Sequence, residues 1–480
     1  MAKAWEIELE ERRSAKPRIV AEHEENWEGL RSLQCSQDNT LKMLWHSEVP
    51  GSGASECLMR GAVQAAENRG LDVSAAEPWL AAGNEAFRRG DMGVLQVATA
   101  RLLHELDRAP KKAKSPYWSF HQIQTWEEHA AAARFPAPVP VALDEDFARR
   151  VYGGWLAQIC GGALGTALEG YTTENIAAVF GEVRGYVRKP DTYNDDITFE
   201  LAFLEAFKER GYSLASADVA DRWVGLIPFG WSAELIALQN LKLGVYPPES
   251  GVRSNPFCEW IGAQMRGAVC GLVAPGDARE AARLAWIDAV ISHAGNGALG
   301  ETFNAILTAL AFVRRDVRAL LEEVAALMPE GTQYRWVIEE SLKACRETAS
   351  AGADAASEAG RAGPASDPAR TAWDRLERRL EHYNWVHAYP NAAAEVVALW
   401  FGGGDFDATM RCIAMAGQDV DCNAAQIATV LGVMNGPESI AANWTGPIGD
   451  TLDTYVRGLE RLSIKGLAED TAAAVRRHQQ

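Results

Sequence analysis

Apolar residues recur at helical spacing along most of this 480-residue chain. In 197–209 they return every three or four residues, and the stretch ends before Gly211, a residue type that commonly follows a helix C-terminus. A second apolar stretch, 422–434, is closed by an Asn-Gly pair. Alternation of the kind that strands show appears only in short pieces such as 183–188. The pattern therefore predicts a mainly α-helical protein with helices over both stretches.

A proline-rich segment, 134–142, divides the chain, because prolines so closely spaced cannot continue a helix. We interpret residues 1–142 as an N-terminal helical extension. A denser, glycine-rich region follows over 143–465 and is expected to be the catalytic domain. It is interrupted at 349–370 by small, polar residues without periodicity, which favours a mobile surface insert.

The composition does not change the predicted fold, but it argues against some classes of partner. Hydrophobic residues make up 48% of the chain and charged residues 23%, as in folded proteins, and the net charge of -18 argues against nucleic acid as a partner. No uncharged apolar run approaches the roughly 18 residues that a membrane span needs, so we expect no membrane partner and a cytoplasmic location. Eight scattered cysteines without a CxxC pair are expected to be free, buried thiols. The oligomeric state stays open.

Two acidic clusters open the two predicted helices: Asn194-Asp195-Asp196 and Asp419-Val420-Asp421. The simplest interpretation is N-capping, in which one carboxylate accepts a backbone hydrogen bond for about 1 kcal/mol. Doubling the carboxylate leaves acceptors that capping does not use. Two such helix ends facing each other would surround a cavity with oxygens that repel one another unless cations fill it, and Mg²⁺ or Mn²⁺ prefers such ligands. Both interpretations remain open on spacing alone.

The glycine-rich stretch 153–170 is not a dinucleotide fingerprint, because no strand and following acidic residue accompany it. Glycines at near-helical spacing more often permit close packing of helices. Glu169 differs from them, since a carboxylate that closes an apolar stretch needs a partner or a task.

Two further segments combine small and polar residues. In 291–301, a histidine, an asparagine and a glutamate stand among small residues that would let a ligand approach the backbone closely, although a lone histidine is more often structural. In 385–391, aromatic residues and His387 precede Asn391, and such side chains can stack on a base or close a pocket.

Taken together, these segments resemble the ADP-ribosylglycohydrolase family over about 146–460. The resemblance rests on four segments in this order: GGALGTALEG, NDDIT, SHAGNGALGE, and GQDVDCNAA followed by LGVMNG. It implies an all-α, orthogonally packed helical bundle, here with the extra N-terminal helical region, and two Mg²⁺ or Mn²⁺ ions. It also implies a glycoside hydrolase that acts on N-glycosyl compounds, at the anomeric carbon of an ADP-ribosyl or related ribosyl group.

Carried over position by position, the resemblance gives three sets of residues. The metal ligands are Asn194, Asp195, Asp196, Asp419, Asp421 and Cys422; the catalytic residues are Glu169, Asp195, Asp196 and Asp419; the substrate contacts are Gly165, Ser292, His293, Asn296, Gly297, Glu301, His387 and Asn391. Two positions depart from the family pattern. Asn194 stands where the family usually has threonine, and so does Cys422, although a thiol is a poor ligand for Mg²⁺.

The chemistry implied is attack of water on the anomeric carbon, with cations on the ribose hydroxyls and carboxylates stabilising the positive charge of the sugar. The partner would be a small-molecule ribosyl substrate or an ADP-ribosylated protein. Two alternatives stay open. One is a nucleoside or small-molecule N-riboside hydrolase, which an extension over the cleft would favour. The other is a non-catalytic descendant that binds ADP-ribose or has a structural role.

Overall fold

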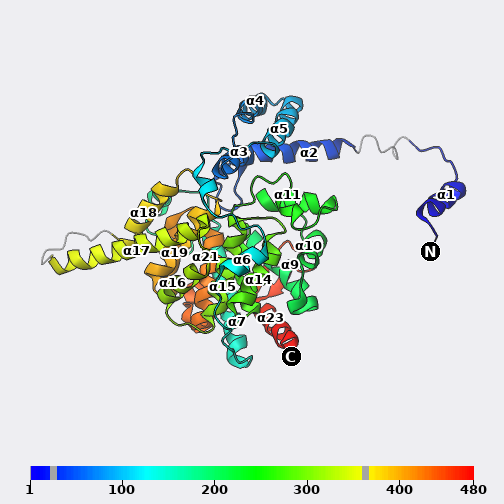
Figure 1. Ribbon diagram of the computed structural model, residues 1–480. Coiled ribbons are helices and arrows are strands. Elements are labelled where there is room, and N and C mark those ends of the chain that lie inside the picture. Colours follow the sequence, from blue (N-terminus) through cyan, green and yellow to red (C-terminus); the bar gives the residue numbers. More distant parts are fainter. Residues whose placement is uncertain (1, 22–29, 359–366, 480) are drawn as a thin grey trace.

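The computed structural model describes residues 2–21, 30–358 and 367–479, without the side chains of 352–358. Helices carry nearly all of its regular structure (Figure 1), which confirms the all-α prediction. Within the described chain, strands form only two short antiparallel ribbons, β1 (Ser47–Glu48) with β2 (Ser55–Glu56) and β3 (Thr451–Asp453) with β4 (Arg461–Ser463). None of the described helices is both long and apolar enough to cross a bilayer.

The N-terminal extension is helical, as predicted, and its compact part lies against one end of the core (Figure 1). Its helices are α1 (Ala4–Ser14), α2 (Leu30–Trp45), α3 (Leu58–Asn68), α4 (Glu77–Arg89), α5 (Met92–Asp107) and α6 (Trp126–Ala132). The side chain of Trp45 donates a hydrogen bond to Thr99, and Gln64 on α3 donates one to a carbonyl oxygen of the core at His382. The extension therefore packs both within itself and against the core.

The core is built from the remaining helices, which run from α7 to α23. They are α7 (Glu145–Gly165), α8 (Thr173–Phe180), α9 (Asp195–Arg210), α10 (Ser216–Leu226), α11 (Ser232–Lys242), α12 (Glu249–Val252), α13 (Gly267–Val273), α14 (Ala278–Ala289), α15 (Asn296–Ala311), α16 (Val317–Leu327), α17 (Gln333–Glu358), α18 (Pro368–Leu380), α19 (Ala388–Gly402), α20 (Phe406–Ala416), α21 (Val420–Asn435), α22 (Ala442–Ile448) and α23 (Ile464–His478). The two helices predicted from periodicity are α9 and α21, and each ends where the following glycine predicts.

Close contact between α7 and α21 organises the centre of the core. A Cβ atom on Gly153 would lie 2.5 Å from the carbonyl oxygen of Gly432, and one on Gly165 would lie 2.0 Å from the backbone nitrogen of Asp421. Only glycine permits this approach of two backbones. The glycine-rich stretch therefore serves helix packing, and Gly165 makes room for α21 rather than for a substrate.

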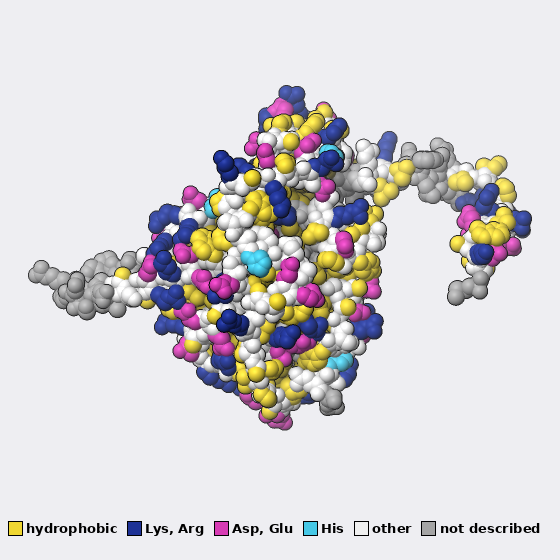
Figure 2. Space-filling model, viewed as in Figure 1, with side chains coloured by type: hydrophobic (Ala, Val, Ile, Leu, Met, Phe, Trp, Pro, Cys, Tyr) yellow, Lys and Arg dark blue, Asp and Glu magenta, His cyan; other side chains and the backbone are white. Residues whose placement is uncertain are grey.

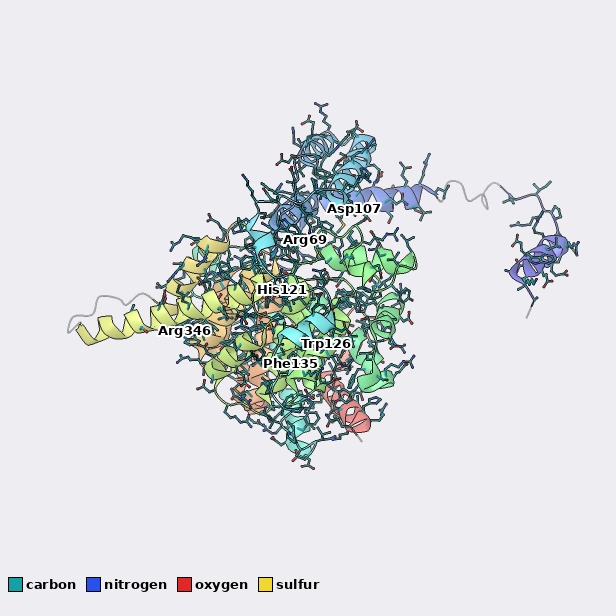
Figure 3. The ribbon with its side chains drawn as sticks, in the orientation of Figure 1. Arg69, Asp107, His121, Trp126, Phe135 and Arg346 are labelled. Atoms are coloured by element: carbon teal, nitrogen blue, oxygen red, sulfur yellow. The ribbon has the colours of Figure 1, made fainter. Side chains whose placement is uncertain are left out.

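The last part of the extension, between α5 and α7, runs over the face of the core on which Figure 3 labels His121, Trp126 and Phe135. The backbone N–H of His121 donates to the carbonyl of Gly331, and the Trp126 and Phe135 rings pack 6.2 Å apart. Lysine and arginine side chains are interspersed with aspartate and glutamate over the face shown in Figure 2.

Two expectations about the surface and the thiols can be compared with the structure. The segment 349–370 is partly regular, because α17 continues through Glu358 and α18 begins at Pro368; residues 359–366 lie outside the described residues. All eight cysteines are free thiols, as predicted, but only five are buried: Cys35 is exposed, and Cys57 and Cys412 are half-buried.

Candidate metal centre

Asn194, and not an aspartate, caps α9. Its Oδ1 accepts a hydrogen bond from the Ile197 N–H at 3.2 Å, and its Nδ2 donates to Asp196 Oδ2 at 3.1 Å. Exchanging the amide oxygen and nitrogen would face a donor with a donor, so this orientation is fixed by its partners. The Asn194 oxygen is therefore used by the helix, contrary to its expected role as a metal ligand. Asp195 and Asp196 are left without a capping task.

The second cluster shows the same excess of carboxylate oxygens. Asp419 stands at the N-cap position of α21, yet its side chain makes no capping hydrogen bond. One oxygen each of Asp419, Asp421 and Asp196 is buried without a hydrogen-bond partner among the described residues. A buried oxygen without a partner costs free energy, so these three oxygens favour a bound ligand, and capping does not explain these aspartates.

The turn that carries Asp419 is held from two sides. Gln418 has a left-handed backbone (φ 66°), and its N–H donates to the carbonyl of Tyr171 in the segment after α7. From α19, Asn391 Oδ1 accepts hydrogen bonds from the Asp419 N–H at 3.1 Å and from Asn423 Nδ2 at 2.7 Å. Asn391 thus positions the start of α21, a role that differs from its predicted contact with substrate.

Five carboxyl groups gather where α7, α9 and α21 meet, and we call them the acidic centre: Glu169, Asp195, Asp196, Asp419 and Asp421. Burial raises the pKa of every one, and charge repulsion adds to it for most. The pKa of Asp421 rises to about 6 through burial and then through Asp195. No lysine or arginine is among the main causes of these shifts. The group is therefore an unneutralised acidic cluster.

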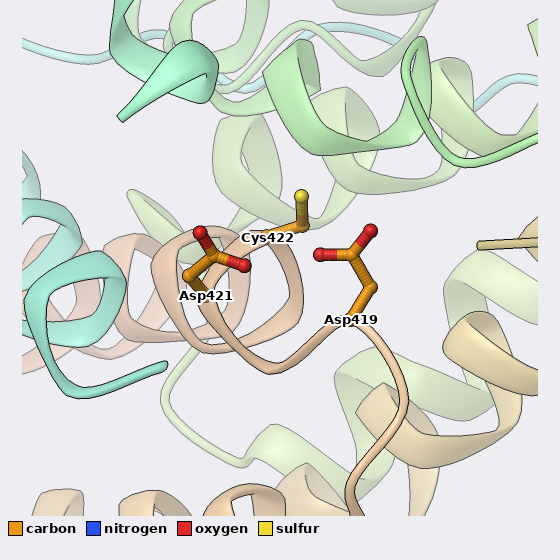
Figure 4. A group of neighbouring side chains, drawn as sticks. All are labelled: Asp419, Asp421 and Cys422. Atoms are coloured by element: carbon orange, nitrogen blue, oxygen red, sulfur yellow. The ribbon is translucent and has the colours of Figure 1, made fainter. Parts of the chain in front are cut away.

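The donor set of the acidic centre fits a divalent cation. The carboxylates of Asp419 and Asp421 and the Cys422 sulfur each offer a ligand atom, and these atoms all lie within 4.8 Å of one another (Figure 4). Carboxylate oxygens are the ligands that Mg²⁺ and Mn²⁺ prefer. Three buried oxygens without partners, supplied by both clusters, leave room for such an ion's bonds.

Glu301 belongs to a different polar group in the interior. Arg266, which is buried, contacts Glu234 Oε1 at 2.9 Å, hydrogen-bonds Asp288 and lies 3.6 Å from Glu301 Oε2. Its guanidinium also stacks over the Trp223 ring at 4.8 Å. We call Arg266, Glu234, Asp288 and Glu301 the Arg266 network. Burial alone would lower the pKa of Arg266, but the three carboxylates raise it, so the arginine stays charged.

Ser292 and His293 adjoin this network rather than a surface. Ser292 Oγ accepts a hydrogen bond from Arg266 Nη2 at 3.0 Å and lies 2.7 Å from His293 Nδ1. Both residues are buried, and burial followed by the Arg266 charge lowers the pKa of His293 well below its usual range. The histidine is neutral and enclosed by protein, so we reassign Ser292, His293 and Glu301 from substrate contact to structure.

The other expected substrate residues are also interior. Asn296 Nδ2 donates to Glu259 at 2.9 Å, and a Cβ on Gly297 would lie 2.3 Å from a backbone carbonyl oxygen. His387 caps α19 by accepting the Tyr389 N–H. Their small neighbours allow helices to approach one another rather than a ligand, and we reassign Asn296, Gly297 and His387 to packing as well.

A carboxylate that the sequence did not indicate comes from the extension. Glu56 on β2 accepts a hydrogen bond from Trp231 Nε1 at 2.6 Å. Burial raises the pKa of Glu56, the Trp231 bond opposes the rise, and the charge of Asp195 adds to it, so Glu56 is an electrostatic neighbour of the acidic centre. The same hairpin contacts the segment after Glu169, where Tyr171 OH donates to the Ser52 carbonyl at 3.0 Å. A lone glutamate 139 residues before its neighbour in space has no sequence signal.

The family described as ADP-ribosylglycohydrolase has a sequence model that matches residues 143–480. An uncharacterized protein of Archaeoglobus fulgidus is 32% identical over 151 residues, which are 29% of this chain and 48% of that protein. The chain thus spans about half the length of this curated relative. A solved structure titled "ADP-ribosylglycohydrolase-related protein complex" aligns with a TM-score of 0.48 and 21% identity, covering 70% of this chain and 100% of its own.

Proposed function

This chain belongs to the ADP-ribosylglycohydrolase family, and we propose that it is a metal-dependent hydrolase that cleaves the N-glycosidic bond at the anomeric carbon of an ADP-ribosyl or related ribosyl group. Family membership supports a glycohydrolase-like function in general. The finer proposal rests on one observation: three carboxylate oxygens, supplied by both aspartate clusters of the acidic centre, are buried without a hydrogen-bond partner among the described residues.

Four aspartates would hold the cations: Asp195 and Asp196 at the start of α9, and Asp419 and Asp421 at the start of α21. When bound there, two Mg²⁺ or Mn²⁺ ions would attract the vicinal ribose hydroxyls and acidify a water molecule. Three of the four aspartates are buried, and Asp195 is half-buried. The arrangement therefore opens toward solvent on the side of Asp195.

The chain's own residues would then do the rest of the chemistry. An aspartate oxygen without a partner can accept a proton from the attacking water. As the glycosidic bond lengthens, positive charge develops on the sugar, and the surrounding carboxylates would stabilise it. Glu169, half-buried beside the same cluster, adds a carboxylate on the side of α7.

A second candidate is a nucleoside or small-molecule N-riboside hydrolase, and the hairpin of the extension favours it. Its tip contacts Tyr171 and its end brings Glu56 beside Asp195. A protein-sized substrate needs an open groove, whereas this hairpin would narrow the site beside the half-buried Asp195. A non-catalytic descendant is the third candidate, and it would bind no stoichiometric metal.

The test is a substrate screen with the full chain. ADP-ribosyl-arginine, ADP-ribosyl-serine and a panel of nucleosides would be incubated with Mg²⁺ or Mn²⁺, and release of ADP-ribose or ribose measured. We expect cleavage that stops in excess chelator and in Asp419→Asn, and that persists in Asp107→Asn, an exposed aspartate at the end of α5. Cleavage of nucleosides alone selects the second candidate. Turnover that continues in excess chelator contradicts the metal-dependent proposal.

A further inference from the structure

Cys422 places a sulfur atom between the two acidic clusters. Its thiol is buried and lies beside the Asp196 carboxylate of the first cluster and the Asp419 carboxylate of the second. Figure 4 shows the sulfur and the two carboxylates projecting from the start of α21. The thiol therefore lies at the candidate metal site, next to the carboxylates that would hold a cation.

A second sulfur lies behind it. Met265 Sδ is 3.8 Å from Cys422 Sγ, and Met265 is buried. Gln426 on α21 hydrogen-bonds the Met265 backbone carbonyl, which fixes this segment against the helix that carries Cys422. Packing therefore keeps the Cys422 side chain at the acidic centre, with a polarizable side chain on its far side.

The candidate ligand atoms of Asp419, Asp421 and Cys422 lie close enough together to bind a single ion. With metal-ligand bonds of about 2.0 to 2.3 Å, two ligands of one ion lie at most about 4.6 Å apart. The Asp419, Asp421 and Cys422 ligand atoms already lie within 4.8 Å of one another, so small side-chain rotations would bring all three onto one ion.

We propose that the cation held by Asp419, Asp421 and Cys422 is bound through sulfur as well as oxygen, so that this site selects Zn²⁺ or Co²⁺ over Mg²⁺. The inference rests on the proposed function, in which this centre binds metal. Mg²⁺ is a hard cation that takes oxygen ligands, whereas a thiolate favours Zn²⁺ and Co²⁺. On binding, the thiol proton passes to solvent and the sulfur takes its place on the metal. Asp195 and Asp196 would supply oxygen alone to the other ion.

Cobalt is the probe, because a thiolate bound to Co²⁺ gives a near-ultraviolet charge-transfer band that oxygen ligands do not give. The full chain, stripped with chelator and kept reduced with a phosphine, would be titrated with Co²⁺. We expect the band to saturate at one ion per chain and to survive a large excess of Mg²⁺. The matched variants are Cys422→Ser, which should lose the band while still binding Co²⁺, and Cys412→Ser, a half-buried thiol on α20 that should keep it.

The Zn²⁺-to-Mg²⁺ affinity ratio should fall at least about tenfold in Cys422→Ser, since changes around a metal ligand alter affinity by this much or more. Co²⁺ bound without the band, or a band displaced by Mg²⁺, overturns this inference and leaves metal binding intact. A wild-type chain that binds none of Co²⁺, Zn²⁺, Mn²⁺ or Mg²⁺ overturns the proposed function together with it. The Mg²⁺ competition uses wild-type protein, so it decides the matter even if Cys422→Ser fails to fold.

Discussion

The core contains two buried groups of carboxylates that solve the same electrostatic problem differently. In the Arg266 network, three carboxylates surround one guanidinium, which touches Glu234 and Asp288 and lies 3.6 Å from Glu301. In the acidic centre, five carboxyl groups gather, and no lysine or arginine is among the main causes of their raised pKa values. Both groups contain buried carboxylate oxygens without a hydrogen-bond partner among the described residues: three in the acidic centre, and one each on Asp288 and Glu301. The Arg266 network contains a cationic side chain of its own, whereas the acidic centre would obtain its positive charge from a bound cation.

Two isolated carboxyls show a third solution. Glu200 accepts hydrogen bonds from Gln158 and Gln426, and Glu395 from Gln264 and Asn304. Burial raises the pKa of each to about 8, so both keep a proton at neutral pH. The protein thus neutralises buried carboxyls with a proton or an arginine where they serve structure. Gathering five of them around one place, with no arginine or lysine among the main causes of their raised pKa values, is what marks the acidic centre as a binding site.

Removing the internal cation should have the largest effect on stability. Arg266→Met leaves Asp288 and Glu234 buried without a counter-charge, and we expect it to lower the free energy of unfolding by about 3–5 kcal/mol. Urea denaturation measures this. Arg314→Met, which breaks a part-exposed pair with Glu323, is the control and should cost less than about 1 kcal/mol. Equal losses of unfolding free energy in the two variants would contradict the stabilising role that we give to the Arg266 charge.

The proton-bearing carboxyls predict a pH dependence. Because the pKa of Glu200 is about 8 in the fold against 4.5 ordinarily, the unfolded chain binds fewer protons between these values, and stability falls as pH rises from 4.5 to 8. At pH 7 this amounts to about 3 kcal/mol. Glu200→Gln cannot ionise and should flatten the slope over that window, as should Glu395→Gln. An unchanged slope in denaturation curves from pH 4.5 to 8 would refute the assignment.

Equivalent substitutions in the two groups should separate binding from stability. Asp421→Asn should weaken Mn²⁺ binding at least about 100-fold, yet leave the metal-free protein as stable or more stable, because it removes one of several repelling charges. Asp288→Asn should do the reverse by weakening the Arg266 pair. Calorimetric titration and denaturation of both variants give the comparison. A metal-free Asp421→Asn that unfolds as readily as Asp288→Asn would contradict it.

The smallest effect should come from the residue that positions Asp419. Asn391→Ala removes hydrogen bonds to the Asp419 N–H and to Asn423 but no metal ligand. We expect about tenfold weaker Mn²⁺ binding, as for other residues that orient ligands. Tighter or unchanged affinity would show that the turn keeps its shape without Asn391.

From the sequence, the helices that carry the acidic centre could be predicted more reliably than the burial of individual residues. Periodicity and following glycines identified α9 and α21, and the doubled aspartates indicated a site. Spacing cannot show whether small residues make room for a ligand or for a helix, and so His293 and Asn296 were misplaced. The role of Glu56 depends on contacts across the whole extension, which no local pattern records.

The most direct test of the account is calorimetric titration of the chelator-stripped full chain with Mn²⁺. The account predicts two ions per chain, of which at least one is lost on Asp421→Asn and both are retained in Asp288→Asn, because the acidic centre, unlike the Arg266 network, has no described arginine at its centre. Absence of stoichiometric binding, or binding that Asp421→Asn leaves unchanged, would contradict it.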